Sequence, residues 1–189
     1  ASTPRSDRPV ACAPGSDNHT PVLVLVPRKP ERFEEVARFI ADAGFACVRR
    51  SLRADGTSVA SPSGGSVILG DTMGELRKFY SLADVVFVGR SLVALGGSDP
   101  MEVAAVGKPI VTGPHMENFE SPVSSLRGAE AIRVVDTADD LPSVIGELLA
   151  DSFARVRLGA AAREVVLRNQ GATHRTADRL VRLMPVAGR

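Results

Sequence analysis

Short apolar runs alternate with amphipathic stretches along this chain, and the alternation restricts the possible folds more than any other feature of the sequence. Residues 22–26 contain only valine and leucine, a pattern typical of a strand that is buried on both faces. Residues 31–43 then carry apolar side chains at helical spacing, and Gly44 stands where a glycine commonly ends a helix. The sequence therefore predicts a strand followed by a helix.

The same alternation continues to the end of the chain. Further strands are predicted at residues 45–48, 67–69, 85–88, 109–112 and 131–135. Further helices are predicted at residues 72–82, 100–107, 137–149, 152–169 and 173–183. The connections are too long for hairpins, so the strands should run parallel. The predicted fold class is α/β, a Rossmann-like parallel sheet flanked by helices.

The size of the chain fits one domain. It has 189 residues, of which 44% are hydrophobic, and this is enough to bury a core. We expect a domain over residues 22–184, preceded at 1–21 by a linker or a truncated first βα unit and followed by a tail at 185–189. Residues 53–66 are rich in serine and glycine and predict a surface loop. Because the chain begins at Ala1 and shows no signal peptide, we expect a fragment or a processed chain.

Several functional classes are disfavoured. The chain has 23 basic and 22 acidic residues, a net charge of +1, and this balance argues against a nucleic-acid partner. No stretch approaches the roughly 20 apolar residues of a membrane span. Cys12 and Cys47 cannot form a disulfide framework, and the sequence lacks C-x-x-C, H-E-x-x-H and G-x-S-x-G motifs. No G-x-G-x-x-G follows a strand, which disfavours a dinucleotide-dependent oxidoreductase.

The loops after the predicted strands are the places to seek a ligand site, because ligands of parallel α/β sheets bind beyond the carboxyl ends of the strands. Arg28 and Lys29 follow the first strand and present two cations to an anionic ligand. A proline-punctuated turn with solvated charges is the simpler explanation of the same residues.

The loop after the third strand combines capping residues with an unexplained glycine. Thr72 and Glu75 are spaced as a capping box for the helix predicted at residues 72–82. Gly74 would then lie in the first helical turn, where glycine costs about 1 kcal/mol relative to alanine. A ligand that must approach the backbone closely would explain this glycine.

Two more loops carry polar residues. Gly89 and Ser91 follow the fourth strand, and glycines before the next helix expose N–H groups that suit a phosphate. Asp99 is spaced as the N-cap of this helix and Glu102 lies in its first turn. A well-capped helix after a flexible loop explains the segment equally well. His115 follows the fifth strand, where it has either a hydrogen-bonding role toward a ligand or a purely structural one.

Taken together, these loops resemble one family. They read PRKPERF, LGDTMGELRKFYSLADVVFVG and SLVALGGSDPMEVAAVGKPIVTGPHMENF, and over residues 22–182 they are similar to the carboxyl-terminal half of 3-deoxy-D-manno-octulosonic acid (Kdo) transferases. The GDTMGEL and GPH-x-x-NF stretches are the most specific. The resemblance implies a GT-B glycosyltransferase, whose carboxyl-terminal domain binds the donor substrate CMP-Kdo. The amino-terminal domain would bind the lipid A precursor and supply the general base.

The resemblance also implies a set of donor-binding residues. Arg28 would meet an anionic group of the donor, Ser91 would approach the phosphate, and Glu102 would hold the ribose hydroxyls. We expect these loops to converge on one pocket, without a metal or further cofactor. The set consists of Arg28, Gly70, Asp71, Thr72, Met73, Gly74, Glu75, Gly89, Ser91, Asp99, Glu102 and His115.

The implied setting is lipopolysaccharide biosynthesis at the cytoplasmic face of the inner membrane, with peripheral membrane association. The isolated domain would bind nucleotide without transferring a sugar. The helix predicted at residues 152–169 carries Arg155, Arg157, Arg163 and Arg168. These arginines either contact anionic lipid headgroups or form a solvated face.

The chain departs from the family pattern at Lys29, Arg90, Ser98, Asp99 and Glu117. A carboxylate at position 99 weakens the attraction of a phosphate, whereas Arg90 adds a compensating charge. Two alternatives therefore stay open beside a CMP-Kdo-binding domain. One is a GT-B domain for another nucleotide sugar, and the other is a non-catalytic, transferase-like binding domain.

Overall fold

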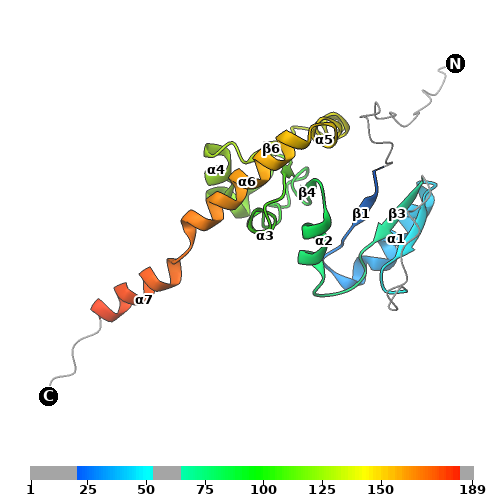
Figure 1. Ribbon diagram of the computed structural model, residues 1–189. Coiled ribbons are helices and arrows are strands. Elements are labelled where there is room, and N and C mark those ends of the chain that lie inside the picture. Colours follow the sequence, from blue (N-terminus) through cyan, green and yellow to red (C-terminus); the bar gives the residue numbers. More distant parts are fainter. Residues whose placement is uncertain (1–20, 53–64, 184–189) are drawn as a thin grey trace. The chain divides into compact units, whose positions relative to one another are not determined.

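The computed structural model describes residues 21–52 and 65–183, without the side chains of residues 172–175. The chain divides after Ala83 into two compact units, which are described separately below. Each unit contains a three-stranded sheet in which every pairing is parallel (Figure 1). The predicted α/β class with parallel strands is confirmed. The linker at 1–21, the loop at 53–66 and the tail at 185–189 lie outside the described residues, apart from the ends of the first two.

The first unit places one helix against its sheet. Its described elements are β1 (Leu23–Leu25), η1 (Pro30–Arg32), α1 (Phe33–Asp42), β2 (Ala46–Arg49), β3 (Ser66–Leu69) and α2 (Leu76–Leu82). The strand order is β1-β3-β2, so β3 is central. Ile40 of α1 packs against Val67 and Leu69 of β3, as the helical spacing predicts. Figure 1 shows α1 lying along this sheet.

The prediction that the first strand is buried on both faces is wrong. In β1, Leu23 is 54% exposed and Val24 is 37% exposed. The reason is that β1 lies at the edge of its sheet and pairs only with β3 among the described strands. An edge strand can keep an apolar sequence and still leave part of its surface open.

The second unit begins with β4 and ends with a pair of consecutive helices. Its described elements are β4 (Val86–Val88), α3 (Met101–Ala105), β5 (Ile110–Thr112), η2 (Glu117–Phe119), α4 (Glu120–Gly128), β6 (Ile132–Val134), η3 (Ala138–Asp140), α5 (Leu141–Ala150), α6 (Ser152–Asn169) and α7 (Ala172–Leu183). The strand order is β4-β5-β6. The helix α4 was not predicted, because only two of its residues, Val123 and Leu126, are both apolar and buried.

The central strand β5 forms the middle of the core of this unit. Its three residues are fully buried. Val111 of β5 packs in one cluster with Val135, which directly follows β6, and with Leu148 of α5 and Leu158 of α6. Helices α5 and α6 therefore stabilise the sheet through a shared apolar cluster, as a parallel sheet requires.

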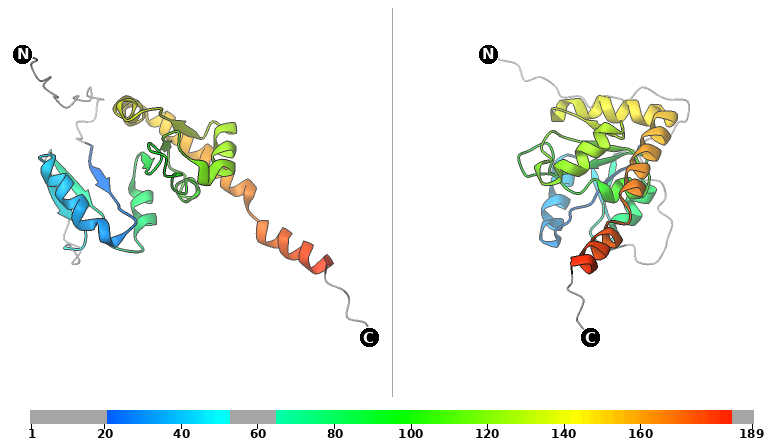
Figure 2. Two further views of the ribbon diagram at one scale, coloured as in Figure 1. Left: turned by 180° about the vertical axis from the view of Figure 1, so that it is seen from behind. Right: turned by 90° about the vertical axis from the view of Figure 1, so that its left-hand side faces the viewer.

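A close backbone contact joins α6 to the end of α3. A Cβ atom on Gly159 would lie 2.1 Å from the carbonyl oxygen of Gly107, so only glycine fits at position 159. Near the start of α6, Arg155 donates to the carbonyl oxygens of Leu148 and Leu149 at 2.7 and 2.6 Å and so caps α5. Figure 2 shows α6 leaving the end of α5 at a steep angle.

This contact predicts opposite results for two glycine-to-alanine changes in helices. Gly159→Ala should lower the free energy of unfolding by about 2 kcal/mol, because the added methyl group collides with backbone. Gly128→Ala meets open space in α4 and should leave stability unchanged or raise it by up to about 1 kcal/mol. Denaturant unfolding of both variants measures the difference. Equal stability of the two variants would contradict the close contact.

Candidate functional site

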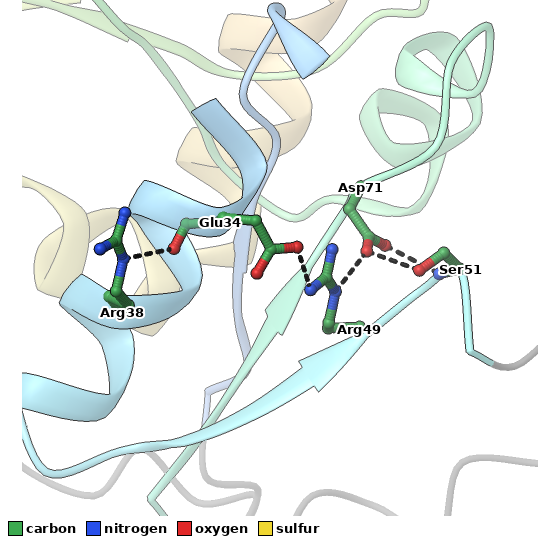
Figure 3. Close-up of polar contacts among 5 residues, drawn as sticks. All are labelled: Glu34, Arg38, Arg49, Ser51 and Asp71. Carbon is green, nitrogen blue, oxygen red and sulfur yellow. Dashed lines mark hydrogen bonds and ion pairs between the residues drawn. The ribbon is translucent and has the colours of Figure 1, made fainter. Parts of the chain in front are cut away.

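In the first unit, a buried carboxylate joins the carboxyl ends of two neighbouring strands. Asp71 follows β3, and its side chain accepts hydrogen bonds from Arg49 Nε at 2.7 Å, Ser51 N at 2.8 Å and Ser51 Oγ at 2.6 Å (Figure 3). Arg49 is the last residue of β2, and Ser51 lies in the turn that follows. The loops after β2 and β3 are therefore held together by one side chain.

The same arginine reaches a second carboxylate on α1. Arg49 Nη1 lies 2.5 Å from Glu34 Oε1, so the guanidinium bridges two acidic side chains. Their surroundings differ strongly, because the side chain of Glu34 is 71% exposed and that of Asp71 is 1% exposed. The buried contact should contribute far more to stability than the exposed one.

The hydrogen bonds keep Asp71 ionised. Burial by itself would raise the pKa of this carboxyl group, but the hydrogen bonds from Ser51 and Arg49 outweigh it and hold the pKa below its ordinary value. The same contacts raise the pKa of Arg49, first through its hydrogen bond to Asp71 and then through that to Glu34. A charged pair therefore lies at this end of the sheet at neutral pH.

A second carboxylate, Glu75, holds the rest of the loop. Its Oε2 accepts from Thr72 Oγ1 at 2.5 Å, and its Oε1 lies 3.1 Å from Lys78 Nζ and 3.2 Å from Arg50 Nη2. The hydrogen bond from Thr72, followed by that from Lys78, lowers the pKa of Glu75. The loop therefore carries carboxylates whose charge is balanced by neighbouring cations.

The predicted capping box between Thr72 and Glu75 is wrong. Helix α2 begins only at Leu76, and Glu75 makes no side-chain capping bond to it. Gly74 thus lies before the helix, with φ +79°, a conformation that favours glycine. This explains Gly74 without a ligand. Of the predicted residues, Thr72 and Glu75 contact each other, Asp71 contacts Arg49 and Ser51, and Met73 is 65% exposed.

Sequence reasoning missed Arg49 and Ser51. The available signal was their position, since they occupy the end of a short strand in a parallel sheet, where polar side chains of neighbouring loops meet. Arg28, by contrast, was predicted. It is exposed after β1 and forms no hydrogen bond or ion pair within the described part of the chain.

In the second unit, Ser91 holds the loops after β4 and β5. Its side chain is fully buried, and Ser91 Oγ donates to the carbonyl oxygen of Val88 at 2.6 Å and accepts from Gly113 N at 2.8 Å. His115 N donates to the carbonyl oxygen of Ser91 at 2.9 Å. A Cβ on Gly113 would lie 2.2 Å from that same oxygen. The hydroxyl and the carbonyl oxygen of Ser91 are therefore both engaged within the protein, and the residue has no exposed surface.

The GPHMENF stretch packs onto the glycines before α3. A Cβ on Gly97 would collide with Met116 Sδ, and one on Gly96 would collide with the side chain of Asn118. Asn118 N also donates to the carbonyl oxygen of Gly96 at 3.2 Å. This contact explains both the glycines before α3 and the GPHMENF stretch, because the two loops pack closely against each other.

Arg90 occupies a position that suits glycine better. Its φ is +64°, in the left-handed region where most side chains are strained, and its Nη2 donates to the carbonyl oxygen of Leu95 at 2.7 Å. The guanidinium therefore braces the loop that follows β4. Gly89, directly before it, is exposed and has open space around it.

The predicted N-cap at Asp99 is off by one residue, because α3 begins at Met101 and its N-cap is Pro100, which makes no side-chain capping bond. Asp99 lies just before the cap, and its Oδ1 accepts from Met101 N at 2.8 Å. Glu102 is exposed in the first turn and forms no hydrogen bond or ion pair within the described ranges. His115 Nδ1 lies 3.1 Å from Glu117 Oε1, and the two side chains are 38% and 63% exposed. The structure thus brings Ser91 and His115 together through backbone.

Three solved or curated proteins show what this chain is similar to. It is 41% identical over 160 residues to 3-deoxy-D-manno-octulosonic acid transferase of Haemophilus influenzae, covering 84% of this chain and 36% of that protein. It is 38% identical over 161 residues to the transferase of the same name from Bordetella pertussis, covering 85% and 36%. The chain therefore spans about a third of the length of these relatives.

A solved structure resembles the fold. The crystal structure of the C-terminal CMP-Kdo binding domain of WaaA from Acinetobacter baumannii matches with a TM-score of 0.70 and 34% sequence identity. The match covers 77% of this chain and 73% of that one. No protein-family model matches the sequence.

Substitutions of Asp71 and Glu34, the two acidic residues that bind Arg49, should have unequal effects on stability. Asp71→Asn should lower the free energy of unfolding by about 2 kcal/mol, because it weakens charged hydrogen bonds in a buried site. Glu34→Gln, which weakens the exposed contact of the same arginine, should cost less than about 1 kcal/mol. Denaturant unfolding at pH 7 compares the two. A larger loss for Glu34→Gln would contradict the assigned roles.

The lowered pKa of Asp71 predicts a pH dependence. A carboxyl group whose pKa is lower in the folded state stabilises the fold above its unfolded pKa of about 3.9. That contribution is lost as the pH falls through the lower folded value. Unfolding measured from pH 6 to pH 2 should show a steeper loss for the wild type than for Asp71→Asn. Parallel curves would show that Asp71 is not the group responsible.

Proposed function

We propose a donor-binding role for this chain, which belongs to the family of Kdo transferases and corresponds to their carboxyl-terminal domain. The donor is a nucleotide sugar, CMP-Kdo. The observation that carries this proposal is the 34% identity to a CMP-Kdo binding domain of which the chain covers 73%. The residues left free at the ends of the strands supply the chemistry.

Two exposed side chains are available for the donor. Arg28 follows β1 with an unengaged guanidinium, a group that binds carboxylate or phosphate through two parallel hydrogen bonds. Glu102, in the first turn of α3, has a carboxylate that can accept the hydroxyl protons of a ribose. Neither is engaged with another side chain in the described ranges, so a ligand would not have to displace a protein contact.

The paired carboxylates of the first unit are compatible with an anionic ligand. Asp71 is neutralised by Arg49, and Glu75 by Arg50 and Lys78. The loop formed by residues 70–75 therefore lacks the unbalanced negative charge that would repel a phosphate. We expect Gly70, Met73 and Gly74 to approach the nucleotide through backbone.

Transfer of the sugar is a proposal about the longer protein. We infer that a lipid A precursor accepts the Kdo, as a step of lipopolysaccharide biosynthesis, and that the acceptor and the general base belong to another domain. Neither a metal nor a further cofactor is expected in this reaction. We place the enzyme at the cytoplasmic face of the inner membrane, associated peripherally. No described helix combines the length and apolarity that a membrane span needs.

A different nucleotide sugar is a second candidate, and one observation favours it. The carboxylate of Asp99 accepts an N–H at the start of α3, a group that would otherwise be open to a phosphate. A changed donor is therefore compatible with the same fold. If no nucleotide binds at all, the chain is a non-catalytic, transferase-like domain.

Calorimetry with CMP, UDP and GDP tests the donor assignment. CMP should bind most tightly, and Arg28→Ala and Glu102→Ala should each weaken binding at least tenfold, because each removes hydrogen bonds to a charged group. Both residues are exposed, so the melting temperature should not change. Arg77→Ala, an exposed arginine on α2, is the matched control and should bind as the wild type does.

The outcomes separate the candidates. Heat with UDP or GDP but none with millimolar CMP would overturn the CMP assignment and leave a GT-B domain for another donor. If a folded chain gives no heat of binding with any of the three nucleotides, the result would favour the non-catalytic domain. If Arg77→Ala weakened CMP binding as much as Arg28→Ala does, the total positive charge of the chain, rather than Arg28, would determine binding.

A further inference from the structure

The second unit contains a hollow lined by three arginines. Its volume is about 360 Å³, and its walls are Arg127 at the end of α4, Glu130, Ile132 and Arg133 of β6, and Arg157 of α6. Ile132 is buried and forms an apolar part of the wall, whereas the four charged residues are exposed. The lining thus has three positive charges and one negative charge.

These arginines have no structural partner that would explain them. Arg127, Arg133 and Arg157 form no ion pair or side-chain hydrogen bond within the described part of the chain. Other arginines of α6 differ in this respect, because Arg155 caps α5 and Arg168 pairs with Glu164 at 3.0 Å. With three arginines and the single carboxylate of Glu130, the lining keeps a net positive charge that attracts an anion.

The hollow is separate from the loops assigned to the donor. The strands of a parallel sheet all have their carboxyl ends on the same side of the sheet. The loops after β4 and β5 lie on that side. Glu130 and Ile132 stand where the chain enters β6, which is the opposite edge of this sheet. The hollow therefore lies away from the loops that are assigned to the donor.

Exposed apolar side chains accompany the arginines on α6. Phe153 is 89% exposed and Val156 is 71% exposed. They precede Arg157 by four residues and one residue, so all three share one side of the helix within a single turn. An exposed aromatic residue beside cationic ones is typical of a surface that lies at a membrane interface.

We propose that Arg127, Arg133 and Arg157 bind the phosphate of an anionic phospholipid headgroup, with Phe153 and Val156 entering the interface. Guanidinium groups suit this ligand because they form paired, charge-assisted hydrogen bonds with phosphate oxygens. The volume is at the lower end of the range for ligand pockets, which fits a headgroup. The assignment deepens the peripheral association proposed above and rests on it, but it does not depend on donor binding.

Co-sedimentation with vesicles tests the proposal. The 189-residue chain should bind vesicles containing phosphatidylglycerol more tightly than vesicles of phosphatidylcholine alone. Arg133→Gln and Arg157→Gln should each weaken binding about fivefold, the effect expected of one basic residue near an anionic surface. Arg77→Gln, which removes the same charge from an exposed site on α2, should leave binding unchanged.

The apolar part of the surface has its own control. Phe153→Ser should weaken vesicle binding, whereas Leu82→Ser, which changes a residue 82% exposed at the end of α2, should not. Equal binding to both kinds of vesicle would overturn the proposal. The proposal would also be overturned if Arg77→Gln weakened vesicle binding as much as Arg157→Gln does.

A soluble anion is the remaining alternative. If inorganic phosphate raises the melting temperature in an Arg157-dependent manner while the vesicles do not bind, the pocket takes a soluble phosphate compound and the lipid assignment is wrong. CMP calorimetry on the same variants keeps the two proposals apart. Arg133→Gln and Arg157→Gln should bind CMP as tightly as the wild type does. This result is expected whether or not the vesicles bind, so failure of the lipid proposal would leave the donor proposal standing.

Discussion

In each unit, one buried polar side chain holds together the loops at the carboxyl edge of a parallel sheet. Asp71 does so through three hydrogen bonds to Arg49 and Ser51, and Ser91 does so through its hydroxyl and carbonyl groups. Parallel strands bring several loops to one edge, where backbone groups would otherwise lie buried without partners. The shape of these loops therefore depends on two short polar side chains.

This arrangement divides the predicted donor-binding residues into two kinds. Asp71, Thr72, Glu75 and the hydroxyl of Ser91 are engaged in the protein, and their role is to shape the loops. The side chains of Arg28 and Glu102 are exposed and unengaged in the described ranges. The convergence of all these loops on one pocket stays a prediction.

The strands and the amphipathic helices could be predicted because apolar periodicity determines them, and α1 lies within the range predicted from its spacing. The start of α2 could not, because Thr72 and Glu75 have the spacing of a capping box yet bond to each other before the helix begins. The contact between Asp71 and Arg49 could not be predicted either, because the two residues are 22 positions apart and only the pairing of their strands brings them together. Long-range polar contacts of this kind leave no local pattern.

Nuclear magnetic resonance of the chain during a CMP titration tests the central claim most directly, because each backbone amide reports on its own surroundings. If the chain binds the donor as proposed, CMP should shift the amide signals of Arg28 and Gly89, which follow strand ends, and of Glu102 in the first turn of α3. The account predicts no shift at Arg133 and Arg157, which line the hollow at the opposite edge of the second sheet. Shifts confined to those two arginines would contradict it.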